Sequence, residues 1–238
     1  MATSERAPDV GADRETTRNL TLMLVLTFAT GVVDVGGFLG FDTVFLGNMT
    51  GNVLILGMGA AGADGLPVLA LSLALVAFIV GAGIASLFLR AGRRGWSPRL
   101  TAVLAVSASL VAGTSVLVWL QPTEHLAAMF AIVMTAGAMG MQAAAARNVG
   151  VADVTTVVVT STIAAWAIDM FARPSRATIL NRRLAAIVTI LVGALVGALL
   201  VKVALWSVFA LAAIVSAVVV VCGHVLASAG AGGATRAS

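Results

Sequence analysis

Residues 42–64 read DTVFLGNMTGNVLILGMGAAGAD, and this stretch decides how the chain is arranged. It begins with strand-prone residues at 43–46 and changes, at the polar cluster NMTGN of residues 48–52, to a run that favours a helix. An Asn or Thr that opens a helix satisfies N–H groups that lipid cannot satisfy. We therefore predict a short strand followed by a half-length helix inside a membrane.

The composition of the whole chain supports a membrane environment. Of its 238 residues, 60% are hydrophobic and 10% charged, and the mean hydropathy is +1.07. Soluble domains are about 45–50% apolar and about 25% charged, so a soluble globule is excluded and the lipid bilayer is the expected partner. The net charge is only +4, and the arginines lie beside apolar runs, where they act as topology signals. We predict no nucleic-acid partner, because no basic face with interleaved aromatics is present.

Six apolar runs are long enough to cross about 30 Å of hydrocarbon: 20–41, 66–89, 100–120, 126–146, 184–201 and 203–227. Residues 148–171 repeat the pattern of 42–64, with strand-prone residues at 154–159 followed by a polar Thr-Ser-Thr cluster. The predicted fold is an all-α membrane protein with six transmembrane helices and two short re-entrant strand/half-helix elements. Residues 20–227 form one transmembrane domain, and polar residues 1–19 and small residues 228–238 are predicted to be disordered tails.

The arginine clusters fix the predicted topology. One cluster spans residues 90–99 and the other spans 173–183. The positive-inside rule places both in the cytoplasm, so the chain crosses an even number of times between them. Runs 100–120 and 126–146 supply two crossings, and 148–171 must then return to its side of entry. The same argument makes 42–64 re-entrant and places both termini in the cytoplasm of a cell with an inner membrane.

Polar landmarks recur at a nearly constant offset along the chain. Asp42 matches Asp153, Thr50 matches Thr160, Gly81 matches Gly193 and Arg90 matches Lys202, all displaced by 110 to 112 residues. We predict an inverted 3+3 repeat, with repeat one at 20–120 and repeat two at 126–227. Transporters built this way commonly bind substrate at the midplane, where broken helices meet. Chance alignment of a sequence rich in Ala, Val and Leu is the alternative.

The motifs of both halves resemble a known family. Residues 31–34 (GVVD), 37–40 (GFLG) and 44–52 (VFLGNMTGN) resemble the signature of the YoaK family of bacterial multi-pass membrane proteins. Residues 138–147 (AMGMQAAAAR), with the threonines at 155–156 and the 160–162 cluster, resemble its second block. The resemblance covers residues 20–226 and implies an integral inner-membrane protein whose biochemical function is not established. Ser161 and Ala143 depart from the usual Gly and Asn, and Ser161 would narrow the approach of a ligand to the backbone.

Two half-helix N-termini that meet at the midplane would present free N–H groups and partial positive charge, which favours a small polar or anionic solute. The predicted solute-binding residues all lie at these two N-termini: Asn48, Thr50, Gly51, Asn52, Thr156, Thr160 and Thr162. The alternative is that these residues only cap and lock the broken helices, without any ligand.

Asp34 is a carboxylate within a predicted span, where an ionised group is costly and needs a partner. It is either a proton or cation site, or a structural ion pair or interfacial residue. Arg147 is the candidate partner, because the repeat offset places it near the level of Asp34, and Gln142 belongs to the same polar group. An ion pair would neutralise both charges.

The predicted function is a secondary transporter or channel for a small polar or anionic solute. The alternative is a structural or accessory membrane protein without transport activity. An enzyme is not expected, because the spans contain no His, Cys and carboxylate cluster and the chain has a single cysteine, Cys222. No catalytic residues, metal site or cofactor are predicted, and the sequence leaves a homo-oligomer open.

Overall fold

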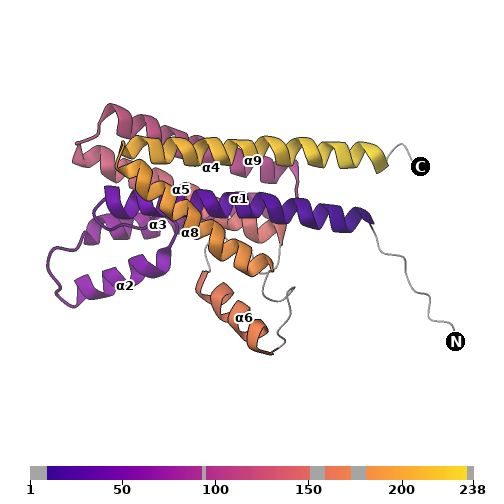
Figure 1. The fold of residues 1–238 in the computed structure, drawn as a ribbon. Coiled ribbons are helices and arrows are strands. Elements are labelled where there is room, and N and C mark those ends of the chain that lie inside the picture. The colour runs from indigo at the N-terminus through magenta and orange to yellow at the C-terminus, as the bar shows by residue number, and fades with distance from the viewer. Residues whose placement is uncertain (1–9, 93–94, 151–158, 173–180, 235–238) are drawn as a thin grey trace.

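The computed structural model describes residues 10–92, 95–150, 159–172 and 181–234. These residues form a bundle of helices (Figure 1). The helices are α1 (Val10–Gly40), α2 (Met49–Ala60), α3 (Val68–Arg90), α4 (Pro98–Leu120), α5 (His125–Val149), α6 (Val159–Ala172), α8 (Arg182–Val201) and α9 (Leu205–Ala234).

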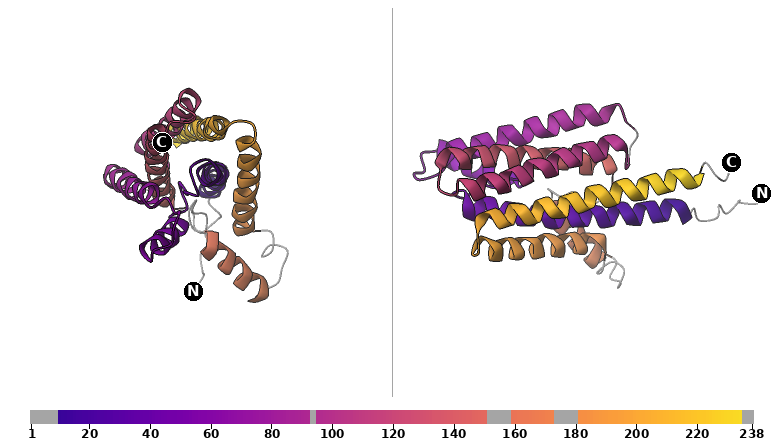
Figure 2. Two further views of the ribbon diagram at one scale, coloured as in Figure 1. Left: turned by 90° about the vertical axis from the view of Figure 1, so that its left-hand side faces the viewer. Right: turned by 90° about the horizontal axis from the view of Figure 1, so that it is seen from above.

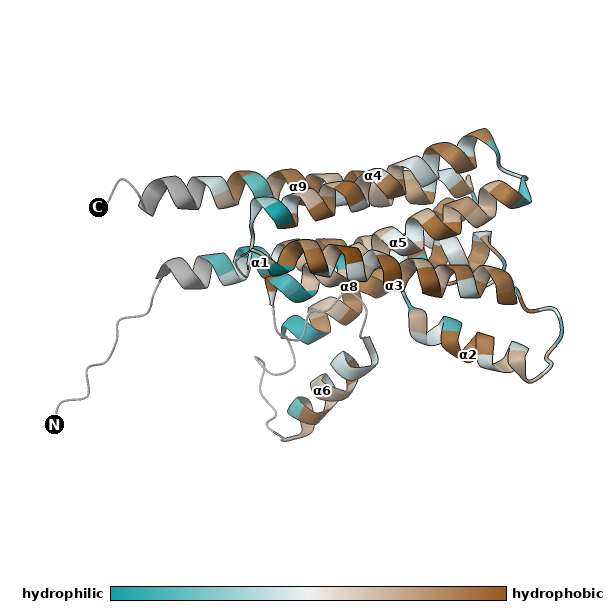
Figure 3. Cartoon of the chain, turned by 180° about the vertical axis from the view of Figure 1, so that it is seen from behind, coloured by the Kyte–Doolittle hydropathy of each residue, from teal (hydrophilic) through white to brown (hydrophobic). Residues whose placement is uncertain are grey.

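Six of these helices are long and apolar enough to cross a membrane: α1, α3, α4, α5, α8 and α9. Their outer surfaces are apolar, and large side chains such as Leu87 and Leu191 are each 66% exposed. Figure 3 shows hydrophobic colour along most of their length and hydrophilic colour mainly near their ends. A surface of this kind is stable only against lipid. The chain is a multi-pass membrane protein, as the six apolar runs predicted.

Helix α1 lies in the middle of the bundle, as the end-on view in Figure 2 shows. It packs mainly against α8 and α9, while α3 packs against α5, and α4 packs against both α5 and α9. Two-thirds of the apolar part of α1 is buried (67%), compared with 17% for α8. The central position explains why α1 carries buried polar groups that a lipid-facing helix would not tolerate.

Two crossings between helices depend on glycine. A Cβ atom added to Gly31 of α1 would overlap Ile190 O of α8, and one added to Gly193 of α8 would overlap Phe28 O of α1. At the other crossing, a Cβ on Gly81 of α3 would overlap Gly137 O of α5, and one on Gly140 of α5 would overlap Phe78 O of α3. Small residues let helix backbones approach this closely in membranes.

The arginines of the described residues gather at one end of the bundle, which we call the basic end. It is defined by Arg18, Arg90, Arg99, Arg147 and Arg183. The Arg18 guanidinium donates to Leu226 O at 3.4 Å, which joins the start of α1 to the end of α9. Gly95 N donates to Asn148 O at 3.4 Å and joins the α3–α4 connection to the end of α5. One apolar cluster containing Leu89, Leu100, Ala145 and Ala186 brings in the start of α8.

The chain between α1 and α3 leaves and returns at the opposite end of the bundle. Gly40, at the end of α1, and Val68, at the start of α3, line one cavity together with His125 at the start of α5. Between them, residues 41–48 turn back along α1, and α2 then packs beside α3. At 1.5 Å per residue the 12 residues of α2 span about 18 Å, little more than half of a hydrocarbon core.

Three details of the predicted organisation are corrected. Residues 43–46 form no strand but an irregular turn, with positive φ at Asp42 (49°) and Thr43 (67°). Helix α1 already begins at Val10 and α9 continues to Ala234, so the predicted tails 1–19 and 228–238 are too long. Glu15 and Arg18 pair at 3.4 Å on the first turns of α1, which stabilises a helix in this polar stretch. The second predicted strand, at 154–158, lies outside the described residues.

Candidate functional site

Asp34 is a buried charged residue in the middle of the bundle. Its side chain lies in α1 and is 9% exposed. The Oδ1 atom accepts hydrogen bonds from three consecutive backbone amides: Leu46 N at 3.0 Å, Gly47 N at 2.6 Å and Asn48 N at 3.2 Å. These amides precede α2, where the N–H groups have no partner within the helix and the helix dipole is positive. Asp34 therefore supplies the negative charge for the N-terminus of α2.

Asn52 holds the same turn from its other side. The side chain is fully buried (0% exposed) in the first turn of α2. Its Oδ1 accepts from Phe45 N at 2.9 Å, and its Nδ2 donates to Phe45 O at 2.6 Å. The amide thus replaces both hydrogen bonds that a neighbouring strand would give to Phe45. This pairing, together with that of Asp34, explains why a strand-prone stretch needs no strand partner.

The turn ends against the central parts of α1 and α5. A Cβ built on Gly47 would lie 3.3 Å from both Met139 Cε and Thr30 Cγ2. Next to this contact, the Gln142 amide of α5 donates to Thr30 Oγ1 at 3.1 Å and to Leu26 O at 3.4 Å. Gln142, predicted as part of an ion or ion-pair group, here forms two buried hydrogen bonds from α5 to α1.

Arg147 lies away from Asp34. It is exposed near the end of α5, and no ion pair joins these two residues, both of which the structure describes. The reason is the direction of the helices: α1 runs away from the basic end and α5 runs towards it. Asp34 therefore lies about one helical turn beyond the Thr30–Gln142 contact, on the side away from the basic end. Arg147 lies more than one turn from the same contact, on the side of the basic end. The hypothesis of an Asp34–Arg147 ion pair is wrong.

The predicted solute-binding residues divide between α2 and α6. Asn48 and Thr50 are exposed at the start of α2, and Gly51 lies against the Phe45 ring, where an added Cβ would approach to 2.7 Å. On α6, which packs against α8, Thr160 is exposed and Thr162 is buried. Thr156 lies outside the described residues. The positive end of α2, predicted to attract an anion, already holds the Asp34 carboxylate.

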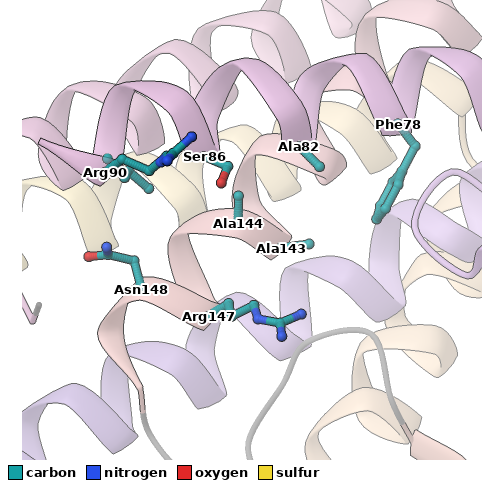
Figure 4. Close-up of a pocket in the computed structure, with 9 residues that line it drawn as sticks. Phe78, Ala82, Ser86, Arg90, Ala143, Ala144, Arg147 and Asn148 are labelled. Atoms are coloured by element: carbon teal, nitrogen blue, oxygen red, sulfur yellow. The ribbon is translucent and has the colours of Figure 1, made fainter.

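A cavity of about 670 Å³ opens between α3 and α5 at the basic end. Figure 4 shows that Ser86 and Arg90 come from α3, whereas Arg147 and Asn148 come from α5. The Oδ1 atom of Asn148 is buried and has no hydrogen-bond partner among the residues that the structure describes. Sequence reasoning singled out Arg147 but missed Arg90 and Asn148 as site residues, because only the packing of α3 on α5 brings them together.

Further polar contacts join the helices. Thr114 and Thr135 share a hydrogen bond of 2.9 Å between α4 and α5, and Ser115 Oγ donates to Trp206 O at 2.9 Å between α4 and α9. Arg183 of α8 pairs with Asp169 of α6 and donates to Ala165 O at 3.3 Å. Within the described ranges, no group of three or more His, Cys, Asp or Glu side chains is arranged to hold a metal ion.

The comparisons with known proteins agree on one family. The model of the family described as "Protein of unknown function (DUF1275)" matches residues 22–222. The chain is also 31% identical over 187 residues to the UPF0700 transmembrane protein YoaK of Bacillus subtilis (strain 168), covering 75% of this chain and 82% of that protein. No solved structure matches the chain. With its six apolar helices, the chain therefore belongs to the DUF1275 family, as a multi-pass membrane protein related to YoaK.

Proposed function

We propose that this protein is a secondary transporter or channel for a small polar or anionic solute, without an enzymatic step. The observation that carries the proposal is the broken element at residues 41–60. A half-length helix follows a turn packed against the central helix, and the three backbone amides just before this helix bond to a buried carboxylate of the central helix. Discontinuous helices of this kind form the substrate and ion sites of secondary transporters.

The proposal includes an inverted 3+3 repeat, and the glycine crossings support it. Gly31 of α1 faces Ile190 O and Ala194 N of α8, and Gly140 of α5 faces Phe78 O and Ala82 N of α3. The partners on α8 are displaced by 112 residues from those on α3, and Gly140 is displaced by 109 from Gly31. Each half thus contributes the same contact to the other half.

The contacts in which the glycine lies on α3 or α8, and the carbonyl on α5 or α1, are related by the same two displacements. Gly81 faces Gly137 O, and Gly193 faces Phe28 O. These glycines also differ by 112 positions and their partners by 109. The short helices follow the same rule, since α2 packs on α3 and α6 packs on α8. A two-fold relation between residues 20–120 and 126–227 would generate all of these pairs.

In the proposed topology, the basic end faces the cytoplasm of a cell with an inner membrane, following the positive-inside rule. Both helical termini, Val10 and Ala234, then lie on the cytoplasmic side. Residues 41–67 form a re-entrant segment that enters from the other side, because α1 ends and α3 begins there. Helix α6 would be part of the corresponding segment of the second half.

A non-transporting structural or accessory protein is the second candidate. It is favoured by the hydrogen bonds of Asp34 and Asn52, which join these side chains to backbone groups of the chain itself. In that case the polar residues only hold a broken helix in place. The transporter proposal differs in requiring that a solute binds to the folded protein and crosses the membrane.

A thermal-shift screen followed by uptake into proteoliposomes tests the proposal. Purified protein is heated with inorganic phosphate, with amino acids and with nucleobases, and each stabilising compound is then offered in labelled form to proteoliposomes. We expect at least one compound to raise the melting temperature and to enter faster than in protein-free liposomes. The Thr50→Val variant shows whether the exposed start of α2 takes part. If well-folded protein takes up none of these compounds, the accessory role is correct.

A further inference from the structure

The charge of Asp34 is compensated only in part by the contacts of the described chain. Its side chain is 9% exposed and belongs to α1, the helix in the middle of the bundle (Figure 2). All three hydrogen bonds to it end on Oδ1, and their donors are backbone amides, which carry no net charge. An ionised carboxylate in an apolar interior is costly without a counter-charge, and such a group commonly takes up a proton instead.

The elements that pack around Asp34 bring no cation to it. Asp42, in the turn before α2, and Lys202, after α8, are exposed, and α2 has no titratable residue. The other charges of α1 precede Asn19. The titratable residues within α5, α8 and α9 are His125, Arg147, Arg182, Arg183, Cys222 and His224. Within the described ranges, Asp34 forms an ion pair with none of these groups.

The second oxygen of the carboxylate, Oδ2, is open to a proton. No described residue donates a hydrogen bond to Oδ2. The fully covered side-chain atoms that lack a partner do not include it, so this oxygen keeps some accessible surface. A proton on Oδ2 leaves Oδ1 as a carbonyl oxygen, which still accepts hydrogen bonds. The fold is therefore compatible with both protonation states of Asp34.

The two protonation states differ in how firmly they hold the turn. Hydrogen bonds to an ionised acceptor are about twice as strong as those to a neutral one. Protonation also removes the negative partner of the positive N-terminus of α2. The ionised carboxylate therefore favours the attached turn, and the protonated one favours its release, which would uncover Val44 and Leu46, both 0% exposed. By linkage, the released turn binds the proton more tightly.

We infer that Asp34 is a proton-binding site, and that a proton on Oδ2 releases residues 41–48 from α1. The proton comes from water and returns to water, so no further reactant is needed. The inference deepens the proposed function by naming the proton as the coupling ion. Coupling to a solute rests on that proposed function, whereas proton binding and release of the turn do not.

The labelling rate of a buried cysteine in the turn tests the inference. In a Cys222→Ala background, Val44→Cys occupies a covered position and should react with N-ethylmaleimide mainly when the turn is released. The rate is measured on the full-length protein in liposomes, from neutral to mildly acidic pH, with Asp34 and with Asp34→Asn. Asparagine is neutral, as the protonated acid is. The ratio of the two rates at each pH removes the pH dependence of the thiol itself.

We expect Asp34→Asn to react about tenfold faster than the parent at neutral pH, because its neutral oxygen holds the turn less firmly. At mildly acidic pH the two rates should become equal, since Asp34 is then protonated. Asp42→Asn removes an exposed carboxylate of the same turn and is the matched control, which should react like the parent at every pH. A ratio for Asp34→Asn that does not change with pH would show that Asp34 is only structural and would overturn the inference.

A second measurement covers the case in which Asp34→Asn does not fold. In the parent, the labelling rate of Val44→Cys is divided by that of Thr43→Cys, whose position is already exposed. This ratio should rise on acidification, in step with the infrared C=O stretching band of a protonated carboxylic acid. An unchanged ratio refutes the release of the turn, and a ratio that rises without the band refutes the proton site.

Proton entry into proteoliposomes separates the inference from the proposed function. An enclosed pH-sensitive dye reports protons that enter when inorganic phosphate, an amino acid or a nucleobase is added outside. Proton entry that accompanies one compound and is lost in Asp34→Asn supports both proposals. Labelling rates that converge at acidic pH, without uptake of any of these compounds, support the proton site and refute their transport. Uptake without proton entry supports transport and refutes the proton as its coupling ion.

Discussion

Asp34 Oδ1 and Gly47 N are joined by a 2.6 Å hydrogen bond that connects the central helix α1 to the start of α2. The contact leaves little room, since a Cβ on Gly47 would also lie 3.5 Å from Asp34 Oδ1 and 3.3 Å from Thr30 and Met139. Three segments, from α1, α5 and the turn before α2, therefore meet at one glycine. A larger residue would push the carboxylate away from the amides that it neutralises.

Replacement of Asp34 by Ala should destabilise the protein strongly. The change leaves the buried amides of Leu46 and Gly47 and the part-buried amide of Asn48 without an acceptor, and unpaired buried groups cost about 1–3 kcal/mol each. We expect a loss of about 3 kcal/mol or more, with a smaller loss for Asp34→Asn, whose oxygen still accepts. Chemical unfolding in detergent micelles measures the free energy of unfolding of both variants. Asp42→Asn, an exposed position in the same turn, is the control, and equal stability of Asp34→Ala and Asp42→Asn would contradict this role.

Asn52→Leu should release the turn before α2. The leucine side chain fills a similar volume but leaves Phe45 N and Phe45 O without partners, at a cost of about 2 kcal/mol or more. Limited proteolysis at residues 41–48 should become faster, and thermal stability should fall. The exposed neighbour Thr50→Val should leave both measurements unchanged. A protease-resistant Asn52→Leu protein would show that the amide does not hold the turn.

The close approach of α3 and α5 predicts a contrast between two glycines. A Cβ at Gly140 overlaps the backbone of Phe78, whereas Gly83, on α3 itself, has nothing within 4 Å. Gly140→Ala should cost about 2 kcal/mol through forced separation of the helices. Gly83→Ala should be neutral or stabilise by up to about 1 kcal/mol, because alanine favours a helix. Thermal unfolding of both variants is the measurement, and similar melting temperatures would refute the tight crossing.

Hydropathy and charge alone predicted the six long helices, because each span must bury its backbone polar groups within itself. The break between α8 and α9 at residues 202–204 also falls where it was predicted. The strand at 43–46 was wrong for a physical reason. Propensity describes what a backbone prefers in the absence of other partners, and here the side chains of Asp34 and Asn52 supply the partners.

The candidate site was less predictable, because it depends on the relative direction and depth of helices. Asp34 was recognised as a buried charge, but its partners are backbone amides rather than Arg147. An offset along the sequence does not give a common depth when two helices run in opposite directions. Arg90 and Asn148 line the same cavity only because glycines allow α3 and α5 to pack closely, and this packing cannot be read from neighbouring residues in the sequence.

The proposed topology predicts which introduced cysteines react from which side. In a Cys222→Ala background, Ala91→Cys and Arg182→Cys should react with an impermeant maleimide only in inverted vesicles. Asp64→Cys and Thr123→Cys should react only in right-side-out vesicles. The reason is that residues 91 and 182 lie at the basic end, and residues 64 and 123 lie at the other. Labelling of positions 91 and 182 from opposite sides would refute the re-entrant segments and the inverted repeat together.

The central position of α1 has a consequence for biosynthesis. The first helix to leave the ribosome finds its main neighbours, α8 and α9, only when synthesis is nearly complete. Until then, the surface around Gly31 lacks its α8 partner, and the carboxylate of Asp34 is covered by the turn that follows α1 and by α5. The pairing of Asp34 with residues 46–48 therefore shields the carboxylate during the time before α8 and α9 have been synthesised.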